Sequence, residues 1–169
     1  ALQRLLSSLE ISLSYNENGE QRIFLNGQDV SEEIRRPDIS ILASDVSAIA
    51  AVRSFLLDMQ RELASRSSVI MDGRDIGTVV LPDADLKIFL TAGAEARAKR
   101  RGKELKEKGI EQSYEDVLRD IRYRDMQDST REAAPLVQAE DALLLDTTEL
   151  TFEESFAALS QIIVERFFM

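Results

Sequence analysis

The sequence predicts an α/β fold, in which a parallel sheet with flanking helices follows a small antiparallel β segment near the N-terminus. Short, continuous apolar runs along residues 68–146 are typical of strands that are buried on both faces, and helix-forming segments follow two of these runs. Nearer the N-terminus, apolar and polar residues alternate between Asn-Gly pairs, which indicates strands joined by tight turns. With 169 residues, 44% of them apolar, the chain is long enough to bury a substantial core.

The N-terminal β segment is predicted at residues 9–30. Residues 11–15 alternate between apolar and polar side chains, as in a strand with one buried face. Asn18-Gly19 and Asn26-Gly27 supply the positive φ angles that a tight turn requires. We therefore expect a small antiparallel meander, followed by a charged connector at Glu32–Pro37.

A helix is predicted over residues 45–64, with Ser44 as its N-cap. Steps of three and four residues place one set of apolar side chains on a single face of this helix: Ile49, Val52, Leu56, Met59 and Leu63.

The apolar runs that predict the parallel sheet are Ser68–Asp72, Leu86–Leu90 and Ala142–Asp146. Two of them end in polar clusters, Asp72–Asp75 and Asp146–Thr148. Because ligands of open α/β sheets bind at the carboxyl ends of the strands, these clusters mark a candidate site.

The predicted helices between and after these strands have recognisable ends. Ala94–Lys108 is rich in helix-forming residues and stops at Gly109. The spacing Ser113-x-x-Asp116 matches a capping box that opens a helix to about Asp128. Thr151-x-x-Glu154 matches another, which opens a helix over Phe152–Phe167.

The composition excludes several kinds of chemistry. Without cysteine or histidine, the chain has no disulfide, no thiolate or imidazole metal ligand and no histidine base. It also contains no glycine-rich phosphate loop of the G-x-x-x-x-G-K-[ST] or G-x-G-x-x-G type. The net charge of −10 disfavours a nucleic-acid-coating role, and no apolar stretch is long enough to span a membrane.

Basic residues are concentrated in one window, which favours an anionic ligand. Residues 97–131 contain 11 of the 21 basic residues and have a net charge of +3, whereas the remainder carries −13. Arginines outnumber lysines by 16 to 5, and arginine is the residue suited to bidentate recognition of phosphate. The sequence therefore predicts a site for a phosphorylated ligand.

The sharpest motif is Asp72-Gly73-Arg74-Asp75-Ile76-Gly77-Thr78. Arg74 can bind a phosphate through its forked guanidinium group, and Asp75 can accept a hydrogen bond from an exocyclic amine. The alternative is a loop in which Arg74 pairs with Asp72 or Asp75, without any ligand.

Two arginine clusters on predicted helices add to this motif. Arg97-x-x-Arg100-Arg101 gathers cations on one patch, which suits an anionic ligand; the alternative is a solvated helix face with Glu104 and Glu107 as partners. The following helix carries three charged residues on one face, spaced by four and three positions: Arg124, Asp128 and Arg131. They either clamp a phosphate and a ribose or form a surface ladder of ion pairs. On the earlier helix, Ser44 and Arg53 read as an N-cap and a surface arginine.

Taken in order along the chain, these motifs together with Ala134-Pro135-Leu136 and Leu145–Thr148 resemble the bacterial cytidylate (CMP) kinases, a family of nucleoside monophosphate kinases with a P-loop α/β fold. The resemblance runs from Ala1 to Met169 and includes the β meander, which is similar to the insertion that marks the bacterial members. It implies a nucleotide-binding region at residues 1–66 and a core at 67–169, with a mobile LID at about 94–131.

The resemblance also implies roles for the individual residues. The cytosine pocket would be lined by Ser44, Arg53 and Asp75, in which a carboxylate accepts from the N4 amino group and disfavours uracil. Arg74, Arg124 and Arg131 would hold the CMP phosphate, with Asp128 toward the ribose hydroxyls. The catalytic set would be Asp72, near the phosphates or the Mg²⁺ shell, and the LID arginines that close over ATP: Arg97, Arg100 and Arg101.

The reaction implied is the transfer of a phosphoryl group from ATP to CMP or dCMP, with Mg²⁺ accompanying ATP. An ionised phosphate oxygen attacks, so no general base is needed and the lack of histidine is no obstacle. Partners are ATP and CMP or dCMP, with neither nucleic acid nor membrane, and we expect a cytoplasmic monomer when the protein is complete.

The chain departs from the family in lacking the P-loop and the central strand before it. Of the family's strand order 2-3-1-4-5, only strands 3, 4 and 5 are represented, by Val69–Asp72, Leu86–Leu90 and Leu143–Asp146. We expect the chain to be part of a longer protein rather than a genuine fragment, and to be inactive alone. The alternatives are a non-catalytic nucleotide-binding module that has lost the P-loop, and a UMP/CMP or adenylate-type kinase.

Overall fold

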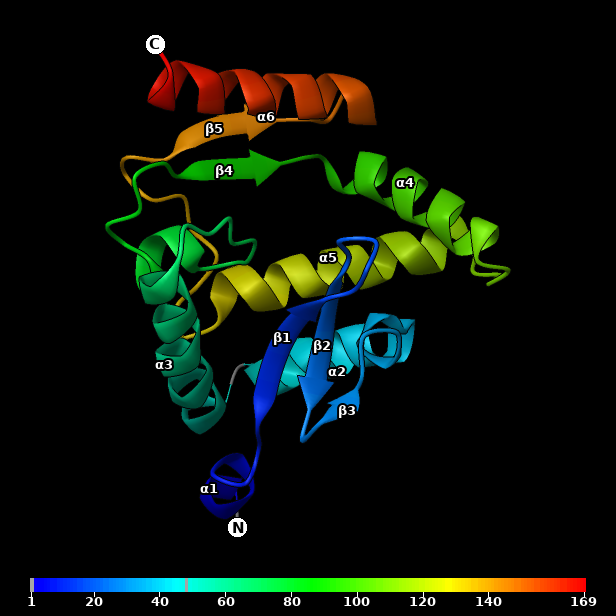
Figure 1. The fold of residues 1–169 in the computed structure, drawn as a ribbon. Helices are drawn as coiled ribbons and strands as arrows, with labels where there is room; N and C mark the ends of the chain where they lie inside the picture. Colours follow the sequence, from blue (N-terminus) through cyan, green and yellow to red (C-terminus); the bar gives the residue numbers. More distant parts are fainter. Residues whose placement is uncertain (1, 48) are drawn as a thin grey trace. The chain divides into compact units, whose positions relative to one another are not determined.

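The computed structural model describes residues 2–47 and 49–169, which form two compact units with a boundary between Val69 and Ile70. The elements of the first unit are α1 (Leu2–Leu6), β1 (Ile11–Tyr15), β2 (Gln21–Leu25), β3 (Gln28–Asp29), the 3₁₀ turn η1 (Glu33–Arg35), α2 (Pro37–Ser47) and α3 (Ala50–Arg66). Those of the second are the π-helical turn η2 (Ile76–Val80), β4 (Ile88–Thr91), α4 (Ala94–Glu107), α5 (Tyr114–Thr130), β5 (Leu143–Asp146) and α6 (Phe152–Phe167) (Figure 1).

The predicted meander is confirmed in the first unit. Strands β1, β2 and β3 form an antiparallel sheet in that order, in which Ile11 lies opposite Leu25 and Tyr15 opposite Gln21. The turns contain residues with positive φ, namely Gly19 at 77°, Asn26 at 50° and Gly27 at 79°. Asn-Gly therefore supplies the left-handed backbone at the second turn, as the sequence predicts.

The single helix expected over residues 45–64 is wrong, because two helices cover this stretch. Helix α2 begins at Pro37, where the fixed φ of proline suits a first helical position, and it ends at Ser47. Ile49 then has an extended backbone (φ −75°, ψ 116°), and α3 begins at Ala50. Ser44 lies inside α2 and is not an N-cap, while its side chain lies outside the described residues. Apolar spacing did not reveal this break because the period continues on both sides of it.

A polar cluster fixes the end of the meander. Asp29 accepts hydrogen bonds from the Ser31 backbone (3.0 Å) and hydroxyl (2.6 Å), and the Ser31 hydroxyl in turn accepts from the Ile23 backbone (2.9 Å). Arg22 pairs with Asp29 at 2.9 Å. The Ser31 bonds, and then Arg22, lower the pKa of Asp29 from 3.8 to about 2.

The pKa of Asp29 predicts a pH dependence of this sheet. A lowered pKa in the folded state means that the ionised carboxylate stabilises the sheet above about pH 4, and that this contribution is lost as the pH falls toward 2. We expect Asp29→Asn to lower stability at pH 5 and to flatten its pH dependence between pH 4 and 2. Thermal unfolding across this range and a carboxyl ¹³C titration of Asp29 measure both effects. Glu17→Gln, in the β1–β2 turn, is the control, and an equal flattening in that variant contradicts the assignment.

The second unit contains a parallel pair of strands, as predicted. Strand β4 pairs with β5 in a register that runs from Ile88 opposite Leu143 to Thr91 opposite Asp146. Figure 1 shows α6 turning back after β5 and running antiparallel to it. Predicted and observed bounds of α6 agree, and the capping box of Thr151 and Glu154 is present in full.

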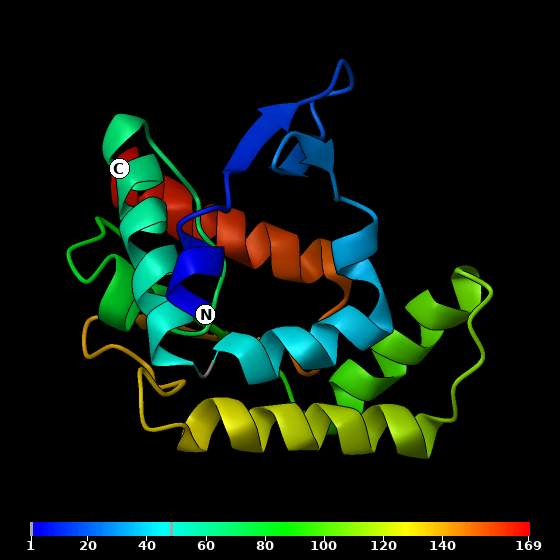
Figure 2. The ribbon, with the colours of Figure 1, turned by 90° about the horizontal axis from the view of Figure 1, so that it is seen from below.

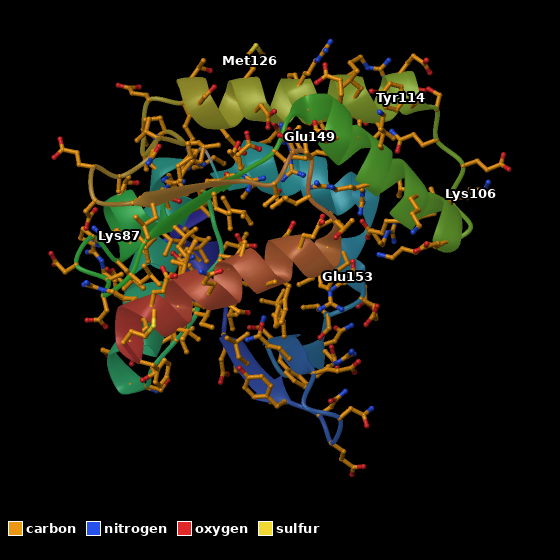
Figure 3. All side chains as sticks on the ribbon, turned by 90° about the horizontal axis from the view of Figure 1, so that it is seen from above. Lys87, Lys106, Tyr114, Met126, Glu149 and Glu153 are labelled. Atoms are coloured by element: carbon orange, nitrogen blue, oxygen red, sulfur yellow. The ribbon has the colours of Figure 1, made fainter. Side chains whose placement is uncertain are left out.

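Lys87 fastens the amino-terminal end of this sheet. Its Nζ lies 2.7 Å from Asp141 Oδ2 and donates to the carbonyl of Pro82. The Lys87 side chain is only 9% exposed. The hydrogen bond from Lys87 is the main cause of the lowered pKa of Asp141. Figure 3 shows Lys87 at one end of the two strands and Glu149 beyond the other end, in the loop that follows β5.

The strand expected at Ser68–Asp72 is not formed. Residues 68–72 have no regular secondary structure, and Val69 and Ile70 are 41% and 95% exposed instead of buried. A strand requires a neighbour for its backbone N–H and C=O groups, and the order expected from the resemblance places this segment beside strand 1, not beside β4. The described part of the chain provides no such neighbour.

Helices α4 and α5 form a hairpin (Figure 2). Ala98, Leu105 and Val117 are buried between them, with Leu118 and Ile121 packed against the cluster. Helix α4 ends before Gly109, which has the positive φ of 72° expected at such a position. The Ser113 hydroxyl accepts from the Asp116 backbone at 3.1 Å and caps α5 as predicted. The hairpin therefore has a small apolar core of its own.

None of the helices among the described residues is long and apolar enough to cross a membrane.

Candidate functional site

A cavity of about 610 Å³ lies in the second unit along the whole of β4, from Leu86 to Ala92. Predicted site residues from two separate segments line it, namely Asp72 and Arg74 from the Asp72–Thr78 motif, and Arg97 and Arg100 from α4. The Asp72–Thr78 motif and the first turns of α4 therefore face the same cavity.

Four predicted residues form an ion-pair network beside this cavity. Arg74 Nε donates to Asp128 Oδ2 at 2.8 Å, across 54 residues of sequence. Arg131 Nη2 lies 3.5 Å from Asp75 Oδ1, and Arg131 Nη1 lies 4.0 Å from Asp128 Oδ1. The loop therefore pairs with the helix α5, and the alternative in which Arg74 pairs with Asp72 or Asp75 is not the arrangement formed.

The network is largely buried except on one side. The side chains of Asp128, Arg131 and Asp75 are 7%, 9% and 13% exposed, whereas that of Arg74 is 45% exposed. Burying charges costs free energy that only close partners offset, so these four side chains hold one another in place. Arg74, the exposed member, is the one that reaches the cavity.

The end of α5 places Asp128 and Arg131. Asp128 lies in the last turn of α5, and Arg131 is its C-cap with an extended backbone (φ −61°, ψ 141°). The chain then turns back through Ala134, whose φ is positive at 53°, so that Leu136 N–H donates to the Asp128 carbonyl at 2.7 Å. Arg131 Nε donates to the Ala134 carbonyl at 2.7 Å. The segment that follows α5 thus holds the Arg131 side chain in place.

Arg97 joins the two helices of the hairpin at the cavity wall. Its Nη1 and Nη2 form a fork on Asp125 at 2.9 and 2.5 Å, and its Nε donates to the Ala92 carbonyl at 2.9 Å. Asp125 is the main cause of the raised pKa of Arg97. This arginine therefore has neither Glu104 nor Glu107 as its partner.

Arg100 and Arg101 have different surroundings. Arg100 donates to the carbonyls of Thr147 and, at 3.0 Å, Leu150, so that it binds the loop after β5. Arg101 pairs with Glu104 at 2.8 Å, as a solvated helix face would have it. Lys108, followed by Arg101, lowers the pKa of Glu104. Of the three arginines for which the resemblance implies a LID role, Arg97 and Arg100 line the cavity.

The remaining predicted residues lie as follows. Asp72 is exposed at the cavity wall, and Arg124 is a half-buried residue of α5 one turn before Asp128. Arg53 belongs to α3 in the first unit, where its Nη1 donates to the Ser47 carbonyl at 3.3 Å.

Sequence reasoning missed Asp125, and it placed Thr147 in the polar cluster after β5 without giving it a role. Asp125 holds Arg97, and the buried Thr147 donates through its hydroxyl to the Thr91 carbonyl at 3.1 Å and accepts from Arg100 at 3.4 Å. Asp125 stands directly beside Arg124 on the predicted helix, but its partner lies 28 residues away, so only helix packing reveals the pair. Within the described ranges, no group of three carboxylates lies close enough together to hold a metal ion by itself.

Comparison with known proteins agrees with these motifs. The family model described as cytidylate kinase matches residues 1–165. Proteins named cytidylate kinase are similar to the chain: one from Caldicellulosiruptor saccharolyticus is 60% identical over 80% of this chain, and one from Thermosipho melanesiensis is 50% identical over 98%. A third, from Carboxydothermus hydrogenoformans, is 51% identical over 96%. The aligned segments span 60%, 74% and 72% of these relatives' own lengths. The chain belongs to the cytidylate kinase family.

Proposed function

We propose that the protein of this chain transfers a phosphoryl group from ATP to CMP or dCMP, giving CDP or dCDP. The observation that carries the proposal is the network of Arg74, Asp75, Asp128 and Arg131, which joins the loop after residue 71 to the end of α5 beside a cavity. It gathers two guanidinium groups and two carboxylates from motifs far apart in sequence. Guanidinium groups suit the phosphate of CMP, and carboxylates suit its hydroxyl and amino donors.

In this proposal the acceptor phosphate is held by Arg74, Arg131 and Arg124, the last of which lies on the same helix as Asp128. Asp128 accepts from the ribose hydroxyls. The phosphate oxygen is ionised at neutral pH and attacks without a base, so catalysis consists of positioning and of charge stabilisation. A chain without histidine can perform this chemistry.

The nucleobase is selected by Asp75, with Ser44 and Arg53 supplying donors to the ring acceptors. Cytosine presents an amino group at position 4, where uracil presents a carbonyl oxygen. An ionised carboxylate attracts the first and repels the second, which supports CMP as the acceptor rather than UMP.

ATP is engaged by the α4 arginines Arg97, Arg100 and Arg101, which neutralise charge on the transferring group, while Mg²⁺ accompanies ATP near Asp72. Closure of the α4–α5 hairpin over the nucleotide excludes water, to which the phosphoryl group would otherwise be lost. We expect the complete protein to act as a monomer.

The test compares CMP, dCMP, UMP and AMP as acceptors for the full-length protein, with ADP release coupled to an optical assay. We expect CMP and dCMP to give the highest kcat/KM. The 169 residues contain no glycine-rich phosphate loop, so we expect no turnover when they are assayed alone. CDP formation by the 169-residue chain contradicts the second expectation, and a preference for UMP or AMP contradicts the role of Asp75.

A second candidate is a non-catalytic module that binds CMP. It predicts that the full-length protein binds CMP in calorimetry but forms no CDP with ATP and Mg²⁺, whereas the kinase proposal predicts both binding and turnover.

A further inference from the structure

Arg97 and Asp125 form a fork at the wall of the cavity. The bonds to Asp125 (2.9 and 2.5 Å) and to the Ala92 carbonyl (2.9 Å) use three of the five N–H groups of the guanidinium, one on each nitrogen. Both side chains line the cavity and are about one-third exposed, 36% for Arg97 and 39% for Asp125. One N–H on each terminal nitrogen is left over from these three bonds, which suits a phosphate oxygen.

A second ion pair joins the same two helices away from the cavity. Glu95 of α4 and Arg122 of α5 approach to 2.6 Å, with side chains that are 57% and 61% exposed. Neither residue lines the cavity. This pair joins the same two helices with the same charge types as the Arg97–Asp125 pair, but it lies away from the cavity.

Holding the hairpin together does not require the Arg97–Asp125 pair. Ala98, Leu105 and Val117 are 0%, 2% and 3% exposed and form the apolar contact between α4 and α5. An ion pair that is about one-third exposed adds little to such a contact, because solvent screens the charges and ordering the side chains costs entropy. The geometry of the fork therefore calls for another explanation.

We propose that Asp125 is a positioning residue, which holds the guanidinium of Arg97 at the cavity wall with two N–H groups directed to the phosphates of ATP. The inference rests on the proposed function, in which Arg97 contacts the transferring phosphoryl group. Asp125 acts through Arg97 and does not touch the nucleotide. Its carboxylate also keeps Arg97 from collapsing onto other acceptors before ATP arrives.

The experiment compares variants of the full-length protein. Asp125→Asn replaces one carboxylate oxygen by an NH₂ group, which donates and cannot accept, so the fork is lost. We expect kcat to fall about 10- to 100-fold and the Kd for ATP to rise about 10-fold, with the KM for CMP little changed. Asp125→Glu keeps a carboxylate with a longer reach and restores part of kcat. Glu95→Gln, the matched control, changes each quantity by less than about two-fold.

A double-mutant cycle separates positioning from mere stability. In Arg97→Ala, adding Asp125→Asn has no further effect on kcat if Asp125 works only through Arg97. The inference is overturned if the two effects multiply, if Glu95→Gln is as damaging as Asp125→Asn, or if the loss follows the melting temperature across the variants. Should the wild type bind ATP but not phosphorylate CMP, the proposed function fails, and the ATP Kd of Asp125→Asn against Glu95→Gln still decides this inference. A wild type that binds no ATP overturns both.

Discussion

Replacing Arg131 by methionine is expected to lower kcat/KM for CMP by about 100- to 1000-fold and to destabilise the second unit by about 3–5 kcal/mol. The reason for the first effect is the loss of a forked donor to the acceptor phosphate. The reason for the second is that Asp75 and Asp128, 13% and 7% exposed, lose the cation that lies 3.5 and 4.0 Å from them. Removing the cation from a buried ionic network leaves its carboxylates less well compensated, although Asp128 keeps Arg74 at 2.8 Å.

Steady-state kinetics and urea unfolding of the full-length protein separate these two effects. Arg131→Lys retains the positive charge without the fork, so we expect an intermediate stability but a low kcat/KM for CMP. Arg119→Met is the control on the same helix, since that side chain is 71% exposed and pairs with Asp116 at its surface. Should Arg131→Met lose stability while its KM for CMP and its kcat stay at wild-type values, the phosphate-binding role is rejected and the network is only structural.

The second large effect concerns the choice of nucleobase. Asp75→Asn is expected to lower kcat/KM for CMP by about 10- to 100-fold, and to reduce the preference for CMP over UMP by a comparable factor. A carboxylate can only accept, which suits the amino group of cytosine, whereas the amide of asparagine can also donate to the carbonyl oxygen of uracil. The change should therefore raise activity toward UMP as well as lower activity toward CMP.

Competing-substrate assays with equal CMP and UMP measure this ratio directly. Asp72→Asn provides the matched control, because Asp72 belongs to the same loop but is exposed, and we expect it to leave the CMP to UMP ratio unchanged even if kcat falls. The Asp75 assignment is wrong if Asp75→Asn loses activity toward both acceptors in the same proportion. That result would point to the ion pair of Asp75 with Arg131 as its whole role.

Elements whose signals are local were predicted well. Helix α6 has its predicted bounds because Thr151 and Glu154 exchange hydrogen bonds within one turn, and a capping box depends on nothing further away. The β1–β2–β3 meander follows from alternation and from Asn-Gly turns, which also act over a few residues. Strand β5 was predicted as well, since its run is apolar and bounded, whereas its pairing with β4 follows from the strand order of the family that the chain resembles.

Two predictions about the backbone were wrong, because nothing in the local sequence reveals the features that decide them. Residues 68–72 have the composition of a buried strand, yet Ile70 is 95% exposed, because composition does not supply the adjacent strand that a ladder needs. The break at Ile49 is equally invisible to apolar spacing, because residues on both sides keep the helical period.

For the candidate site, the sequence by itself determined which residues carry charge and which share a helix face: Arg74 and Asp75 in one loop, Arg97 and Arg100 on α4, Asp128 and Arg131 at the end of α5. Tertiary structure alone decided their partners. Arg74 pairs with Asp128 rather than with a carboxylate of its own loop, and Arg97 pairs with Asp125 rather than with Glu104. The physical reason is that an arginine has acidic residues within reach along its own chain segment as well as across the fold. Burial and helix packing, which bring together groups 28 and 54 residues apart, select among them.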